Sequence, residues 1–193
     1  MEYKEMRMNY YVYLKKEIER CGVGNGGDLK PEGLGWTIGQ SPHELATFLA
    51  AVWPIETFLE IGTGPAGGLS RFLAEVLGVR VTTVDGNNYG LGVPGVRYVI
   101  LPAGESLWIV EGQYDVVFLD GPHNYEGVAC GYEHYRDCSK IVAIHDIEGL
   151  RGCPGVRQFW QQVSRTKTGR MRRGFCETID VGIGRVGIGW RVQ

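Results

Sequence analysis

The feature that most constrains this chain is the segment 58–86, FLEIGTGPAGGLSRFLAEVLGVRVTTVDG. It contains a G-x-G-x-x-G pattern at Gly62, Gly64 and Gly67, and Asp85 follows the last of these glycines by eighteen residues. A strand that turns sharply into a helix presents free backbone N–H groups and the positive end of the helix dipole, and glycines let a ligand approach that backbone closely. The spacing is typical of a dinucleotide site, but the same geometry serves an adenosine cofactor without a pyrophosphate. The glycines alone do not distinguish a dinucleotide from an adenosine cofactor without a pyrophosphate.

The rest of the chain alternates between strand-like and helix-like stretches. Apolar alternation predicts strands over 56–61, 79–84, 96–101, 114–119 and 140–144, and helical spacing predicts helices over 3–20, from Ser41, over 67–77, over 125–137 and after Pro154. Strands that alternate with helices favour a mostly parallel sheet, so we expect an α/β protein, a three-layer αβα sandwich. The last segments, GFCETIDVGIG and RVGIGWRVQ, predict an antiparallel hairpin with a tight turn around Gly184 and Arg185.

Composition and charge narrow the class of partner. The net charge of −2 gives no reason to expect nucleic acid or an anionic membrane as a partner. No apolar run reaches the roughly 18 residues of a membrane span, and the charged amino terminus does not read as a signal peptide, so we expect a cytoplasmic protein. The five cysteines lack a C-x-x-C pair and are interpreted as incidental thiols, and the basic run at 165–173 as a solvated loop or a contact for an acidic acceptor.

The residues around the glycine loop distinguish the two cofactors. Glu60 precedes the first glycine by two positions, where a negative charge favours a cationic sulfonium over a pyrophosphate. Four motifs follow in order: EIGTGPAGG, VTTVDG, LPAGESL and YDVVFLDGPH. Together they resemble the Rossmann-like (class I) S-adenosylmethionine-dependent methyltransferases, from about residue 37 to residue 190. The segments IGQSPHEL and DGPHNYEGV are similar to small-molecule O-methyltransferases, including those that act on sugars and phenols.

This resemblance implies a seven-stranded sheet in the order 3-2-1-4-5-7-6 with strand 7 antiparallel. Together with the helices expected before the first strand, it divides the chain into a helical lead-in and cap at 1–53 and a cofactor-binding domain at 54–193, within one compact domain. The cofactor is then S-adenosylmethionine, with S-adenosylhomocysteine as product. The residues that match its binding site are Glu60, Gly62, Thr63, Gly64 and Gly67 at the methionine moiety, Asp85 and Asn87 at the ribose, Ala103, Gly104, Glu105 and Ser106 beside the adenine, and Asp120 beside the sulfonium. From the residues alone, Asp85 also fits a turn-forming Asp-Gly pair.

Methyl transfer requires an acceptor whose nucleophilic atom has lost its proton, and two devices could achieve this. In cation-dependent members of the resembling class, acids that end strands four and five hold a divalent ion, and here these are Asp120 and Asp146. Two oxygen ligands and water suit Mg²⁺, whereas recruitment of His145 would favour a softer ion. The sequence departs from the best-known cation-dependent pattern, because Ile147 stands where that pattern has Asn.

The second device is a general base. His123 and His145 follow the carboxyl ends of strands, where ligands bind in open α/β sheets, and either could act together with Asp120 as the catalytic group. Gln40 and Trp36 could close over the cofactor or the acceptor, and an aromatic loop residue packed on the core is equally compatible with the pattern.

The sequence therefore predicts a methyltransferase that acts on a hydroxyl of a small molecule by in-line displacement, with a divalent cation as an option and the number of subunits left open. Two alternatives remain: an NAD-dependent oxidoreductase, for which the chain has no supporting Tyr-x-x-x-Lys pair after the glycine loop, and a non-catalytic cofactor-binding or assembly domain.

Overall fold

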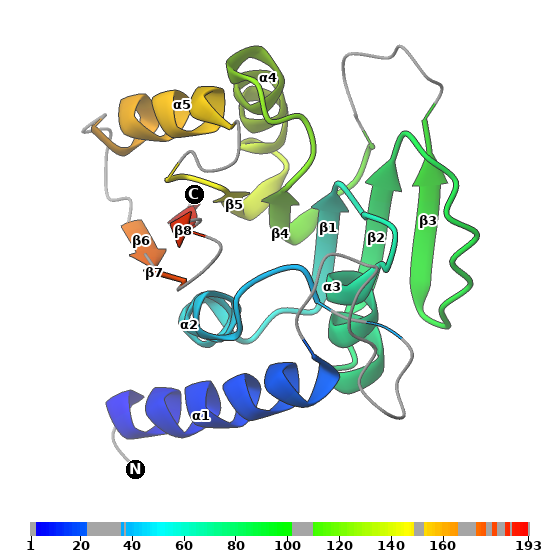
Figure 1. Cartoon of the computed structure of the whole chain (residues 1–193), viewed down its shortest axis with the longest axis vertical. Coiled ribbons are helices and arrows are strands. Elements are labelled where there is room, and N and C mark those ends of the chain that lie inside the picture. Colours follow the sequence, from blue (N-terminus) through cyan, green and yellow to red (C-terminus); the bar gives the residue numbers. More distant parts are fainter. Residues whose placement is uncertain are drawn as a thin grey trace.

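A central sheet organises the molecule. The computed structural model describes residues 3–22, 36, 38–101, 110–148, 153–165, 173–176, 179–180, 184–185 and 187–192. The strands of the sheet are β1 (Thr57–Ile61), β2 (Arg80–Asp85), β3 (Val96–Ile100), β4 (Tyr114–Leu119), β5 (Ser139–His145), β6 (Arg173–Cys176) and β9 (Ile188–Val192). They lie in the order β3-β2-β1-β4-β5-β9-β6 (Figure 1). The first five strands are parallel, and β9 runs antiparallel to both β5 and β6. The predicted order, with an antiparallel seventh strand inserted before the sixth, is confirmed.

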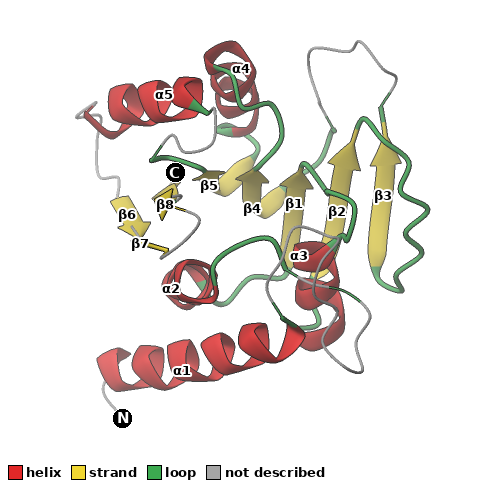
Figure 2. Cartoon of the chain, in the orientation of Figure 1, coloured by secondary structure: helices red, strands yellow, loops and turns green. Residues whose placement is uncertain are grey.

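Helices cover both faces of this sheet. They are α1 (Tyr3–Cys21), α2 (Pro42–Val52), α3 (Gly68–Arg71), η1 (Phe72–Val76), α4 (Tyr125–Tyr135) and α5 (Pro154–Arg165). In Figure 2, α1, α2 and α3 lie below the sheet, and α4 and α5 lie above it. The central strands β1 and β4 are buried on both faces for most of their length, as expected for parallel strands between two helical layers. The predicted three-layer sandwich is therefore confirmed.

Two apolar clusters fill the spaces between the layers. Below the sheet, Leu14 and Ile18 of α1 and Phe48 of α2 pack in the same cluster as Phe58 of β1. Above it, residues of α4 and α5, among them Phe159, pack against the opposite faces of the central strands. Helices α1 and α2 thus share one core with the strands that follow them, and the Nη2 of Arg7 ties α1 to α2 by donating to the carbonyl oxygen of Ala51 at 2.6 Å.

Two local structures differ from the prediction. The helix expected over 67–77 contains a π-helical turn, in which the Leu77 N–H donates to the Phe72 carbonyl oxygen at 3.3 Å, and periodicity does not reveal such a turn. The tight turn predicted at Gly184 and Arg185 is wrong. These two residues form strand β8 (Gly184–Arg185), which pairs antiparallel with β7 (Ile179–Asp180).

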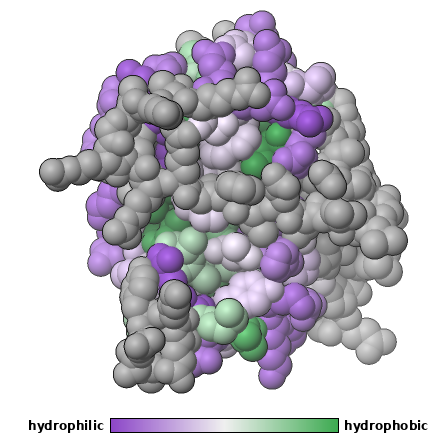
Figure 3. Space-filling model, turned by 90° about the vertical axis from the view of Figure 1, so that its left-hand side faces the viewer, coloured by the Kyte–Doolittle hydropathy of each residue, from purple (hydrophilic) through white to green (hydrophobic). Residues whose placement is uncertain are grey.

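The surface on the β6 side of the molecule is mixed. Seen from there, the apolar surface forms separate patches among more hydrophilic regions (Figure 3). Among the described helices, none combines the length and the apolar character that a membrane span requires.

Candidate cofactor and acceptor site

The glycine loop that follows β1 is built by close backbone contacts. Gly62, Gly64 and Gly67 all have positive φ, at 101°, 65° and 55°. The Gly62 N–H donates to the Val84 carbonyl oxygen at 2.8 Å, and the Asp120 N–H donates to the Ile61 carbonyl oxygen at 2.8 Å. These bonds join the carboxyl ends of β1, β2 and β4 at one place. A Cβ at position 62 would lie 2.1 Å from the carbonyl oxygen of Asp120, so this glycine is required by the approach of β4 itself.

A cavity of about 420 Å³ opens over this loop. Its volume falls within the range of roughly 300 to 1,000 Å³ that is typical of small-molecule sites. The structure brings most of the predicted cofactor residues to its wall: Glu60, Gly62, Thr63, Gly64, Gly67, Asp85, Asn87 and Asp120. His123 and Gln40 line the same cavity. The predicted adenine neighbours, Ala103, Gly104, Glu105 and Ser106, lie outside the described residues.

Asp85 is the last residue of β2, lines the cavity and contacts the glycine loop that follows β1. Its Oδ2 accepts a hydrogen bond from the Gly64 N–H at 3.1 Å, and its Oδ1 accepts one from the Asn87 N–H at 2.9 Å. The second bond is the local turn that an Asp-Gly pair favours. Both interpretations of Asp85 are therefore compatible with the structure, because one carboxylate caps a turn and faces the cavity.

Glu60 lies beneath the loop and is only 2% exposed. Its Oε2 accepts hydrogen bonds from the Ser70 hydroxyl and, at 2.9 Å, from the Thr83 hydroxyl, which is 2.6 Å from the Thr63 hydroxyl. Burial raises the pKa of Glu60 to about 8, and the two hydroxyl donors offset only part of this effect. In the cofactor-free protein Glu60 is therefore mostly protonated at neutral pH. Its predicted attraction for a sulfonium requires the ionised form.

A cluster of two carboxylates and two imidazoles lies at the carboxyl ends of β4 and β5. The Nδ1 of His145 is 3.0 Å from Oδ1 of Asp120 and 3.4 Å from Oδ1 of Asp146. The Nε2 of His123 is 3.3 Å from Oδ2 of Asp146 and 3.6 Å from Oδ1 of Asp120. The remaining oxygen of Asp120 accepts a hydrogen bond from Nε2 of Gln40 at 2.7 Å. All four predicted catalytic or metal-binding residues are thus neighbours.

The two histidines and Asp120 shift one another's pKa values, so that His145 and Asp120 form a charged pair. Burial opposes the charged form of His145, but the adjacent Asp120 carboxylate dominates and raises the pKa of His145 to about 9. Burial likewise acts to raise the pKa of Asp120, yet the charge of His145 and its hydrogen bonds with the two histidines lower this pKa below its usual range. A hydrogen bond to Asp120 raises the pKa of His123. At neutral pH His145 is an imidazolium that orients Asp120, while His123, with 43% of its side chain exposed, faces the cavity.

Sequence reasoning placed Gln40 near the cofactor or the acceptor but did not foresee its bond to Asp120, and it missed Cys153. Gln40 reaches Asp120 from a segment 80 residues earlier, and its Oε1 is buried without a hydrogen-bond partner among the described residues. Cys153, interpreted as an incidental thiol, donates to Oδ2 of Asp146 at 3.5 Å, and burial raises the pKa of this thiol to about 11. Its place directly before the Pro154 that opens α5 was a usable signal, because a helix that follows a parallel strand starts near the crevice.

Asp146 has an unusual backbone. Its φ of 58° lies in the left-handed region and is the one positive value among the described residues other than glycine. Such a conformation costs of the order of 1 kcal/mol or more and is found where the surrounding structure imposes it, often at functional sites. The left-handed turn brings one carboxylate oxygen toward His145 and the other toward His123 and Cys153.

Comparison with known proteins identifies the fold. A scan against protein-family models finds no match, and a search of curated proteins finds none either. Solved structures do match: an O-methyltransferase from Bacillus cereus in complex with S-adenosylhomocysteine has a TM-score of 0.57 and 15% identity, covering 97% of this chain and 91% of that one. The chain has the class I S-adenosylmethionine-dependent methyltransferase fold.

Other proteins with this methyltransferase fold extend the comparison. The O-methyltransferase TomG from Streptomyces achromogenes, involved in tomaymycin synthesis and solved with S-adenosylmethionine, has a TM-score of 0.55 and 16% identity, covering 96% of this chain and 88% of that one. A human methyltransferase 10 domain containing protein has a TM-score of 0.51 and 11% identity, covering 95% and 81%. At such identities the likeness concerns the fold, and the choice of acceptor has to be argued from the site.

Proposed function

We propose that this protein is an S-adenosylmethionine-dependent methyltransferase that acts on a hydroxyl group of a small molecule. The observation that carries the proposal is the single cavity that joins the glycine loop and Asp85 to Asp120 and His123. A cofactor pocket and a group able to accept a proton therefore share one wall. When bound there, S-adenosylmethionine supplies an electrophilic methyl group on a sulfonium.

Each residue of the cavity then has a defined task. Because glycines lack side chains, the cofactor's amino-acid tail can lie close to the backbone of the glycine loop. The Asp85 carboxylate accepts hydrogen bonds from the ribose hydroxyls. Asp120 is fixed by Gln40 on one oxygen and by His145 on the other, so its position at the end of β4 is rigid. A rigid wall aligns the acceptor for in-line displacement, which is the main contribution an enzyme can make to this reaction.

Removal of the acceptor's proton is assigned to the β4–β5 cluster. His123 is the exposed imidazole at the cavity and is the better base, because His145 is already charged and bonded to Asp120. A divalent cation held near Asp120 and Asp146 would perform the same task by lowering the pKa of the acceptor hydroxyl. Both devices place the acceptor oxygen beside His123.

The acceptor is proposed to be a small molecule because the chain has a net charge of −2 and lacks the basic character that nucleic-acid binding requires. We also propose that the protein acts in the cytoplasm. The number of subunits stays open.

Calorimetry with S-adenosylhomocysteine and with NADH tests the cofactor. Micromolar binding of the first and none of the second is expected, and the reverse result would refute the proposal in favour of an oxidoreductase. Asp85→Asn keeps the shape of the side chain and should weaken S-adenosylhomocysteine at least tenfold. Turnover is then measured with methyl-labelled cofactor on a panel of hydroxylated acceptors, with His123→Ala as the inactive variant. Binding without transfer to any acceptor would instead indicate a non-catalytic domain.

A further inference from the structure

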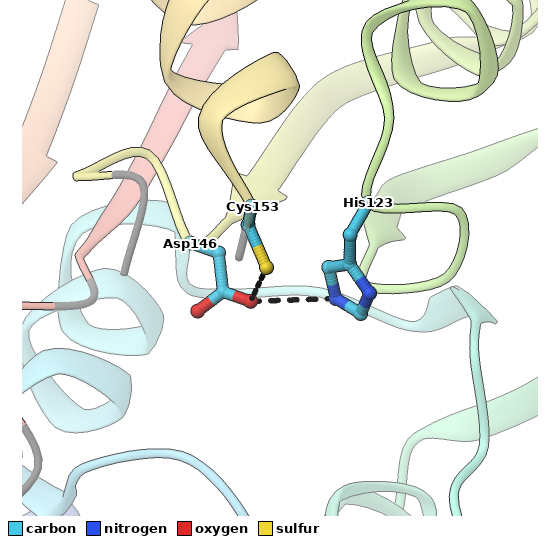
Figure 4. A group of neighbouring side chains, drawn as sticks. All are labelled: His123, Asp146 and Cys153. Atoms are coloured by element: carbon cyan, nitrogen blue, oxygen red, sulfur yellow. Dashed lines mark hydrogen bonds and ion pairs between the residues drawn. The ribbon is translucent and has the colours of Figure 1, made fainter. Parts of the chain in front are cut away.

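Three potential metal ligands of different chemistry converge beside the cavity. His123 comes from the loop after β4, Asp146 directly follows β5, and Cys153 directly precedes α5. Figure 4 shows the three side chains pointing toward one another. Oδ2 of Asp146 is 3.3 Å from Nε2 of His123 and 3.5 Å from Sγ of Cys153, and the three ligand atoms all lie within 4.8 Å of one another.

The two distances from Asp146 fit two edges of a tetrahedral zinc site. Zinc binds imidazole nitrogen and carboxylate oxygen at about 2.0 to 2.2 Å and thiolate sulfur at about 2.3 Å. Two ligands of a regular tetrahedron are separated by roughly 1.6 times the bond length, which gives about 3.3 Å for a nitrogen–oxygen edge and about 3.5 Å for a sulfur–oxygen edge. An octahedral Mg²⁺ site has oxygen–oxygen edges of only about 2.9 Å and does not recruit a thiol.

Asp120, the neighbouring carboxylate, is less available to bind a metal ion. Both carboxylate oxygens of Asp120 are taken by nitrogen groups, one by His145 and the other by Gln40. The second oxygen of Asp146 faces His145 at 3.4 Å, an outer contact of the kind that orients metal-binding carboxylates. Nε2 of His123 lies farther from Asp120, at 3.6 Å, than from Asp146. His123, Asp146 and Cys153 are therefore the described residues whose ligand atoms face one another most directly.

We propose that His123, Asp146 and Cys153 form a three-ligand site for a borderline divalent ion of the Zn²⁺ type, with the fourth position open toward the cavity. Binding forms a metal–sulfur bond and releases the thiol proton of Cys153 to solvent. The site replaces the Asp120–Asp146 pair as the location of the expected cation, and it exchanges Mg²⁺ for a softer metal. It rests on the proposed function only in assigning the open position to the acceptor oxygen. With the ion bound, His123 is a ligand and no longer the base, and the ion would instead lower the pKa of the acceptor hydroxyl. Three protein ligands with one open position are typical of catalytic zinc.

Cobalt substitution tests the site directly on the full chain. Protein freed of metal with a chelator is titrated with Co²⁺, which reports thiolate ligation by a sulfur-to-cobalt charge-transfer band and tetrahedral geometry by intense visible bands. We expect both signals at one equivalent. We also expect Zn²⁺ to abolish them at stoichiometric concentration and Mg²⁺ to leave them unchanged at a hundredfold excess. Absence of the charge-transfer band in the unaltered protein, or displacement of Co²⁺ by Mg²⁺, would overturn the proposal.

Two thiol variants make the assignment specific. Cys153→Ser should lose the charge-transfer band and bind Co²⁺ at least tenfold more weakly. Cys138→Ser is the matched control, since its thiol donates to main-chain carbonyl oxygens near the end of α4 and belongs to neither group of possible metal ligands, and it should keep both signals. A band that persists in Cys153→Ser overturns the site. S-adenosylhomocysteine binding, measured on the same samples, separates the two proposals. Normal binding without cobalt signals refutes only the metal site, and cobalt signals without binding refute only the methyltransferase proposal.

Discussion

Replacing Gly62 by alanine should destabilise the protein far more than replacing Gly64, although the two glycines belong to one motif. At position 62 the added Cβ would lie 2.1 Å from the carbonyl oxygen of Asp120, 2.6 Å from the carbonyl carbon and 2.9 Å from the Cα of Gly121. All three are backbone atoms, so no side chain can rotate away. At position 64 nothing lies within 4 Å of the added Cβ.

The expected magnitudes follow from this difference. Both residues have positive φ, which costs an alanine roughly 1 to 2 kcal/mol. Gly64→Ala should therefore lose about 1 kcal/mol of stability. Gly62→Ala adds an overlap of more than 1 Å with β4, and overpacking of a rigid site costs about 1 to 3 kcal/mol or more. It also strains the bonds that join Gly62 to Val84 and Asp120 to Ile61, so we expect a total of about 3 to 5 kcal/mol.

Urea denaturation of both variants measures the two free energies of unfolding. Calorimetry with S-adenosylhomocysteine shows whether the position of Asp120 has changed, and Gly62→Ala should bind at least tenfold more weakly if it folds. Equal destabilisation of the two variants, within about 1 kcal/mol, would refute the argument that Gly62 is required by the approach of β4.

Further predictions concern buried and partly buried acids. Because the folded pKa of Glu60 is about 8 and its ordinary value is 4.5, its contribution to stability is complete below pH 4.5 and is lost as pH rises toward 8. The loss amounts to a few kcal/mol, and urea denaturation at pH 5.5 and pH 8.5 should show that Glu60→Gln removes this part of the slope; an unchanged slope would contradict the buried protonated acid. The affinity for S-adenosylmethionine relative to the neutral S-adenosylhomocysteine should rise with pH through about 8 and lose this rise in Glu60→Gln, which calorimetry at several pH values checks. Partial burial acts to raise the pKa of Asp115, but hydrogen bonds from Lys140 and two backbone N–H groups lower it to about 2. Asp115→Ala should therefore cost about 2 to 3 kcal/mol in denaturation experiments at pH 7, whereas Lys140→Ala, at a side chain that is 78% exposed, should cost less than 1 kcal/mol. Similar losses for these two variants would show that the ion pair, and not the backbone capping, stabilises the start of β1.

Much of the fold was predictable because local patterns and topology agree. The apolar run within 114–119 and the glycines after 61 each specify one element, and a parallel sheet brings the carboxyl ends of its strands together. For that reason Asp85, Asp120 and His123 could be placed at one cavity without coordinates.

The remaining features depend on contacts that are distant in sequence. Nothing near Gln40 indicates that it bonds to Asp120, because the contact depends on how α2 packs beneath the sheet. The charge of His145 could not be inferred either, since it results from burial beside one particular carboxylate. The thiol of Cys153 looked incidental because its partners lie on two other segments.

The insertion of β9 between β5 and β6 has a consequence for the order of folding. Among the strands that the structure describes, β6 pairs only with β9, a strand that is synthesised after it. During translation β1 to β5 can pair as they emerge, whereas β6 has no place in the sheet until β9 has docked against β5. We therefore expect a nascent chain that ends before residue 188 to present β5 as an open edge, and such an edge is a point where partly made chains can associate.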